Sequence, residues 1–132
     1  MGQQQLLLLV LSVIIVGIAI VVGITMFNDQ SASANLDAVC NDLTNLASRA
    51  QQYAIRPEAM GGGGGDFDNL TIQHLTSDPT NGNGTFALLS AGGNLASIQG
   101  TGTLDGDNDG NPCQATVSVN IDSIVSMIVN NR

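Results

Sequence analysis

The sequence predicts an α+β fold, in which one long N-terminal α-helix packs on a small antiparallel β-sheet. Three observations predict it. Leu6 to Ile24 is an apolar run without a charge, and Leu36 to Ala54 repeats apolar residues at helical spacing. After Pro57, short β-like runs alternate with Gly and Asn turns. A sheet placed after such a helix can bury one of its faces on the amphipathic half of that helix.

The apolar run from Leu6 to Ile24 has Ser12 as its only polar side chain. As a helix it is about 28 Å long, close to the thickness of the hydrocarbon core of a bilayer. A helix on the surface of a globular domain needs a polar face toward water, and this run has none. It therefore lies either in lipid or among helices that are equally apolar.

Two ordinary explanations of this run are weaker than packing against other helices. A secretory signal peptide begins with basic residues, whereas Met1 to Gln5 contain neither Lys nor Arg. A single membrane anchor remains an alternative. However, basic residues that would flank its cytoplasmic side are missing, and the first basic residue is Arg49.

The helix is expected to continue well beyond the apolar run. The polar stretch from Phe27 to Asn35 contains no Pro or Gly, and Pro57 then stops the helical pattern. One continuous helix of about 80 Å is therefore predicted from residue 2 to residue 56. The apolar stripe of its second half consists of Leu36, Val39, Cys40, Leu43, Leu46, Ala47, Ala50, Tyr53 and Ala54. The predicted organisation is a helix over 1–56, whose part at 1–26 lies in lipid or in a core of equally apolar helices, a Gly-rich loop over 57–68 and a β-rich head over 69–132.

Five glycines, Gly61 to Gly65, interrupt the chain after the helix and predict a surface loop. A phosphate-binding loop is disfavoured because no Lys-Ser/Thr pair follows the glycines. Hairpin turns are predicted at 81–84 and 91–94. The final run from Ile124 also fits a helical period, but its β-branched residues favour a strand. The predicted strands are Leu70–His74, Thr85–Ser90, Leu95–Gln99, Ala115–Ile121 and Ile124–Val129.

Composition limits the partners of the protein. The 132 residues include three Arg, no Lys and eleven acidic residues, which gives a formal net charge of -8. Nucleic acid is an unfavourable partner because phosphate binding needs a basic face, and anionic lipid headgroups are unfavourable for the same reason. There is room for one domain beside the apolar helix.

The head is small enough to need a covalent staple or neighbouring copies for its stability. Cys40 lies on the apolar stripe, and Cys113 follows a Gly/Asn/Pro turn. A disulfide between them is favoured over two separate buried thiols, because the chain has an extracellular character. It would close a loop of about 74 residues and contribute at most about 4 kcal/mol. A catalytic thiol is disfavoured, since no His pairs with either Cys.

The architecture resembles that of type IV pilins and, more broadly, of the pilin-like filament superfamily. The resemblance rests on the uncharged run Leu6 to Ile24, its helical continuation to Arg56 and the small β domain that follows. It implies that the helices assemble into a filament core while the β domains form the outer wall. It also implies a membrane-inserted pool of subunits and removal of a short leader by a prepilin peptidase. Met1 would then be the first mature residue and a site of N-methylation.

The resemblance also implies which residues take part in assembly. Bacterial type IV pilins usually carry Glu at the fifth mature position, where it pairs with the terminal amine of a neighbour. Gln5 stands there in this chain, so a neutral contact would replace a buried ion pair. Gly17 can let helices approach closely, whereas Gly23 is equally compatible with a weak point in the helix. The expected assembly residues are Gln5, Leu6, Leu9, Ile15, Gly17 and Val22.

An acidic segment resembles the start of a calcium loop. Asp105, Asp107 and Asp109 alternate with other residues before Gly110, so their carboxylates can converge on one hard cation. Thr116 stands where an EF-hand needs a bidentate Glu, so the segment is not an EF-hand. Two interpretations stand, a calcium site with these three ligands and a solvated acidic turn.

Other single residues carry weaker signals. His74 is the only histidine and has no acid/base partner in the sequence, so a surface or sheet position is expected. Asn69 and Asn83 begin glycosylation sequons. No catalytic triad, nucleotide loop or zinc cluster is present in the sequence, and the chain is not expected to be an enzyme.

The expected function is that of the major subunit of an extracellular filament. The expected partners are other copies of the chain, the inner membrane before assembly and the pilus assembly machinery. No cofactor is required, and calcium is the only candidate. The alternatives are a minor pilin or secretion-system pseudopilin and, from another class, a single-pass anchored extracellular binding module. Cell adhesion, motility and DNA uptake are the candidate roles of such a filament.

Overall fold

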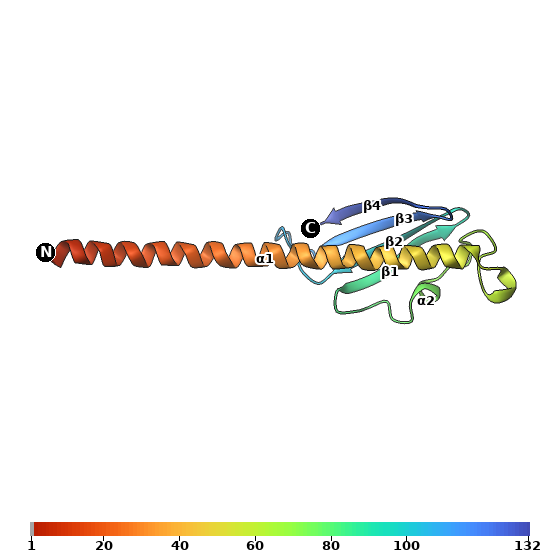
Figure 1. Ribbon diagram of the computed structural model, residues 1–132, viewed down its shortest axis with the longest axis horizontal. Helices are drawn as coiled ribbons and strands as arrows, with labels where there is room; N and C mark the ends of the chain where they lie inside the picture. Colours follow the sequence, from red (N-terminus) through yellow and green to blue (C-terminus); the bar gives the residue numbers. More distant parts are fainter. Residues whose placement is uncertain (1) are drawn as a thin grey trace.

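The computed structural model describes residues 2–132 and confirms the predicted α+β fold (Figure 1). A single 54-residue helix packs along its second half on a four-stranded antiparallel sheet. Its first half projects from this head as a rod (Figure 1). The elements in chain order are α1 (Gly2–Ile55), a short 3-10 helix (Glu58–Met60), α2 (Ile72–Leu75), β1 (Gly84–Gly92), β2 (Leu95–Gly102), β3 (Gln114–Asn120) and β4 (Ile124–Asn131).

Helix α1 ends within one residue of its predicted limit, just before Pro57. It runs without interruption through Gly17 and Gly23, so neither glycine breaks it. Pro57 stops the helix because its ring disfavours helical geometry at the preceding residue. The C-terminal carbonyls of α1 then need other partners.

The glycine loop supplies those partners. The backbone N–H groups of Gly63 and Gly65 donate to the carbonyls of Tyr53 and Ala54, with N···O distances of 2.9 and 2.7 Å. Gly65 has a φ of 108°, and the same left-handed half of conformational space is occupied at Gly61 and Gly64. The loop is therefore the C-terminal cap of α1. A side chain at Gly61, Gly64 or Gly65 would strain the backbone of this cap because of the positive φ.

The sheet is a simple meander with the order β1-β2-β3-β4. The predicted hairpin at 91–94 is confirmed, since Gly92 pairs with Leu95 and Gly93 has a φ of 55°. The turn at 81–84 is closed by an isolated antiparallel bridge between Thr80 and Thr85. The last run forms a strand, β4, as its β-branched residues favoured.

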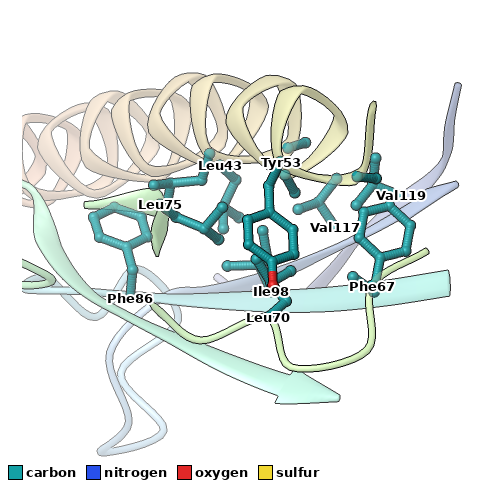
Figure 2. Close-up of a cluster of buried hydrophobic side chains, with 14 of the residues drawn as sticks. Leu43, Tyr53, Phe67, Leu70, Leu75, Phe86, Ile98, Val117 and Val119 are labelled. Atoms are coloured by element: carbon teal, nitrogen blue, oxygen red, sulfur yellow. The ribbon is translucent and has the colours of Figure 1, made fainter. Parts of the chain in front are cut away.

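The core lies between α1 and the inner face of the sheet (Figure 2). The helical stripe that the sequence predicts is buried at Val39, Leu43 and Ala47. Alternate residues of β3 face it, as the period of a strand requires. Phe86 and Leu75 lie toward one end of the core and Phe67 toward the other, with Tyr53, Leu70 and Ile98 between them (Figure 2).

The prediction of a strand at Leu70–His74 is wrong, because Ile72–Leu75 form the single-turn helix α2. The backbone N–H of Thr71 donates to His74 Nδ1 at 3.1 Å, which satisfies a donor at the start of this turn. Leu75 is buried against the core, and its carbonyl accepts a hydrogen bond from Arg49 Nη1 at 2.7 Å. The helical turn brings Leu75 inward, and this tertiary contact overrides the β propensity of the segment.

The predicted disulfide is also not formed, and Cys40 and Cys113 are free thiols. Cys113 Sγ donates to Asn35 Oδ1 at 3.2 Å. Burial raises the pKa of both thiols, and for Cys40 the nearby Asp37 and Cys113 raise it further. Both cysteines therefore stay protonated at neutral pH and serve as packing groups.

Asn35 takes over the anchoring role that the sequence assigns to the disulfide. Its Nδ2 donates to the carbonyl of Asn83 at 2.8 Å, and its Oδ1 accepts from the N–H of Thr103 at 2.9 Å. One helical side chain thus holds two loops, one that leads into β1 and one that follows β2. The sequence places Asn35 among polar residues and carries no signal for this role.

Gly100 on β2 permits the close approach of α1 to the sheet. A Cβ at this position would lie 2.7 Å from Val39 Cγ1 and 2.9 Å from the ring of Phe86.

We expect Gly100→Ala to destabilise the head by about 1–3 kcal/mol through overpacking. Urea unfolding of the full chain in detergent, followed by the near-UV signal of the head, measures this change. Gly82→Ala is the matched control because its Cβ meets nothing within 4 Å. Equal stability of the two variants would contradict this packing argument.

Candidate functional site

The first half of α1 is the largest surface of the described chain that lacks a partner. The large apolar side chains from Leu6 to Phe27 are between 49% and 71% exposed. The most apolar window of α1 meets the length and composition of a membrane span, and none of that window is buried. The head packs only against the second half of the helix (Figure 1). This long apolar helix suggests membrane insertion or secretion.

The exposed segment offers an uncharged surface on every side. Leu6, Leu9 and Ile15 point in different directions because a helix turns once every 3.6 residues. Its two hydroxyl groups are satisfied internally, since Ser12 Oγ donates to the carbonyl of Leu8 and Thr25 Oγ1 donates to that of Val21. A partner of this segment therefore meets apolar side chains alone.

The other expected assembly residues lie in the same segment. Val22 is 49% exposed, and Gly17 has no side chain or foreign backbone within 4 Å of its Cβ position. Gln5 lies in the first turns of α1 and is exposed. Met1, the expected processing site, lies outside the described residues.

The acidic loop between β2 and β3 brings its three carboxylates together. One carboxylate oxygen from each of Asp105, Asp107 and Asp109 lies within 4.8 Å of the others. Asp105 Oδ1 and Oδ2 accept the backbone N–H groups of Asn108 and Gly110, each at 2.8 Å. This convergence is the geometry that a hard cation needs, and the same hydrogen bonds hold an acidic turn without an ion.

The carboxylates of this loop differ in their proton affinity. Desolvation within the turn raises the pKa of Asp107, and the side chains of Asp105 and Asp109 raise it further. The backbone N–H of Asn111 holds the pKa of Asp109 below its ordinary value, with help from the Asn131 side chain. Asp109 thereby ties the loop to the end of β4.

The two sequons differ in accessibility. Asn69 is exposed and has a φ of 66° at a turn. Asn83 is half-buried, and its Nδ2 donates to Asp42 Oδ2 at 2.8 Å. A glycan on Asn83 would have to break this bond, whereas Asn69 is open to modification.

His74 is exposed, in keeping with the expected surface position. Its ring stacks on Tyr53 with a centroid separation of 4.9 Å, and its Nδ1 accepts the backbone N–H of Thr71. These contacts give the imidazole a structural role at the end of α1.

The structure therefore defines a long apolar N-terminal helix packed on a four-stranded antiparallel sheet, which is a pilin-like architecture. In comparisons with known proteins, no family model matches the chain, no curated protein matches it and no solved structure matches it. The functional argument consequently rests on the exposed helix and on the surfaces of the head.

The pKa shifts in the acidic loop predict an order of titration. In an NMR titration of the full chain in detergent, Asp107 should take up its proton at a higher pH than Asp109. Because the pKa of Asp109 is lowered in the fold, its hydrogen bonds stabilise the loop above the ordinary Asp pKa. That contribution is lost as the pH falls through the lowered pKa, and the side-chain amide signals of Asn131 should shift there. The reverse order would contradict the described geometry.

The same titration with calcium separates the two interpretations of the loop. A calcium ion bound by all three carboxylates requires them to be ionised, so it should move the Asp107 titration to lower pH. An acidic turn without a site should show the same titration with calcium or with sodium at equal ionic strength. Asp107→Asn should abolish a calcium-dependent shift of the Asp109 signal, and Asp122→Asn, an exposed acid outside the loop, should leave that shift intact.

The accessibility of the sequons predicts where an N-linked glycan is attached in a glycosylating host. Asn69→Gln should remove a glycan from the chain. Asn83→Gln should change the mass of the chain only by the difference between the two side chains. Intact-mass analysis measures both. Loss of a glycan from the Asn83 variant alone would show that the bond to Asp42 does not protect this amide.

Proposed function

We propose that the chain is the structural subunit of an extracellular helical filament of the type IV pilus kind. The observation that carries the proposal is the exposure of the apolar half of α1. In water, leaving its 17 large apolar side chains exposed costs roughly 25 kcal/mol in total, which exceeds the stability of an ordinary domain. The segment must be covered, and parallel packing of many copies covers it on every side.

The shape of the chain supports assembly through this segment. The head lies at the far end of α1, so copies aligned side by side can bury their first halves in a central bundle (Figure 1). The heads then form an outer wall around that bundle. Gly17 lets neighbouring helices approach closely, since it has no side chain on an exposed helix surface.

The proposal includes the life cycle of such a subunit. Before assembly, the apolar segment holds the chain in a membrane, where assembly machinery collects it. Cleavage of a leader would make Met1 the first mature residue, and intact-mass analysis of the filament subunit tests this start and any added methyl group. Major rather than minor subunit status is tested by the abundance of the chain in the filament.

A charge in the apolar segment tests the filament core directly. We expect Ile15→Asp to abolish filaments, because an unpaired carboxylate among packed apolar helices is strongly unfavourable. Electron microscopy of sheared filaments gives the readout, and immunoblots of the membrane fraction confirm that the subunit is present. Leu89→Asp is the matched control, since Leu89 is an exposed apolar residue of the head.

Two results would overturn the proposal. Filaments of normal abundance from the Ile15 variant would show that this position lies outside a helix core. A wild-type chain that stays in the membrane as dispersed subunits would favour the single-pass anchored module instead.

A further inference from the structure

A second exposed apolar surface lies on β4, at the edge of the sheet. The eight residues Ile124–Asn131 carry no charged side chain, although the chain has 14 charged residues among 132. β4 pairs only with β3, and among the described residues no strand pairs with its outer edge. Charged side chains and Pro, two of the devices that protect a sheet edge in monomeric proteins, are missing from β4, and its exposed apolar side chains indicate a partner.

Three side chains of β4 lie on the face that packs toward α1. Ile124, Met127 and Val129 are opposite the buried residues Val119, Val117 and Ala115 of β3. Directly opposed residues in a ladder share a face. Nevertheless Ile124, Met127 and Val129 are 40%, 36% and 43% exposed, whereas their three β3 neighbours are fully buried. We call these three residues the β4 shelf.

The shelf is exposed because α1 lies over β2 and β3. The part of each shelf side chain that the rest of the chain leaves uncovered is open to solvent. At the Val129 end it opens into a groove of about 530 Å³ beside Ala32 and Leu36, where α1 leaves the sheet. Val129 lines this groove, and Met127 and Ile124 continue from it along β4. We call the groove and the shelf together the strip.

The opposite edge of the sheet, at β1, is partly covered. The loop before β1 covers part of its edge, since the Phe86 N–H donates to the carbonyl of Pro79 at 2.8 Å and Thr80 bridges Thr85. The sheet thus has one edge that its own chain partly covers and one that is open. This asymmetry indicates that β4 is the edge that meets a partner.

The occupant of the shelf docks through side chains. Val125 and Asn130 are unmatched in the pairing of β4 with β3, so they form bulges that bend the strand. Bulges interrupt the regular row of backbone groups that an added strand would need. A helix needs no such row, and its apolar side chains can fill the groove and cover the shelf beside α1.

The charge of the strip limits its occupants, and the free surfaces of the chain leave one candidate. Its groove is lined by Asp29, Asp37 and Asp107 together with Arg132, so a strongly acidic segment is excluded by repulsion. The second half of α1 carries acidic residues, whereas the segment from Leu6 to Phe27 carries none and is fully available. Within the described chain, this segment is the one apolar helical surface that lacks a partner.

We propose that the β4 shelf of one copy binds the apolar α1 segment, Leu6–Phe27, of a second copy of this chain. The inference rests on the proposed filament and names a contact within it. The shelf lies beside roughly residues 33–50 of its own helix. Val129 and Leu36 line the groove at one end of this range, and the Gln51 side chain donates to the Asn120 carbonyl, just after β3, at the other.

For the shelf of one copy to meet residues 6–27 of a parallel copy, the two copies must be offset by roughly 35 Å along the helix axis.

Site-specific photocrosslinking in filaments tests the contact. A benzophenone side chain at Met127 should link to a peptide within Leu6–Phe27, and filaments mixed from ¹⁴N- and ¹⁵N-labelled chains identify the link as intermolecular. The same probe at Ile128 is the matched control. Ile128 is on the same strand and 57% exposed, but it is opposite Thr116 on the other face. The Ile128 probe should give no link to this segment.

Substitution provides a second measurement. Met127→Asn and Val129→Asn should each raise the concentration at which filaments dissociate by about tenfold, as expected for losing one buried apolar side chain. Ile128→Asn should change that concentration by less than about twofold. The shelf proposal would be overturned if filaments form normally, the Met127 probe gives no intermolecular link and all three substitutions have equal effects. The filament proposal would stand in that case. Absence of filaments from the wild-type chain would overturn the filament proposal itself.

Discussion

A single helix, α1, carries both the apolar segment that has no partner within the chain and the stripe on which the sheet packs. These two roles are inseparable because the helix is continuous, with Pro57 ending it only after the head is reached. Burial of the second half fixes the head at one end of a rod. The exposed first half then requires apolar surroundings, since its side chains meet water on every side. The proposed membrane pool and filament core both satisfy this requirement.

The head reaches a defined structure without a covalent staple. Gly100 allows α1 to approach the sheet, and Asn35 holds two loops from the helix side. The glycine loop caps the C-terminal carbonyls of α1. Each of these contacts joins the helix to the chain that follows it. A head built in this way keeps its position on the rod, as the proposed packing of subunits through their helices requires.

The chain has two apolar surfaces without a partner among the described residues, and the proposed contact joins them. The first half of α1 is uncharged and apolar on every side, whereas the β4 shelf is apolar and ends in a groove lined by acidic residues and Arg132. When two different surfaces of identical copies bind each other, the same rotation and translation relates each copy to the next. The copies form an open helical array if that rotation does not close them into a ring. In the proposed filament these two surfaces of one chain would specify a polymer, and the formal net charge of -8 would oppose unspecific contacts between heads.

The sequence by itself determined the helix, the sheet and the segment that needs a partner. Hydrophobic period and Pro57 are local signals, and they place α1, β1, β2, β3 and β4 close to their observed limits. Only the tertiary structure decided the turn at Leu75, the free thiols and the exposure of the β4 shelf. The apolar residues of β4 fit a strand or a helix in sequence, and their exposure depends on how far α1 covers the sheet. Such outcomes depend on contacts between residues distant in the chain, which no local pattern contains.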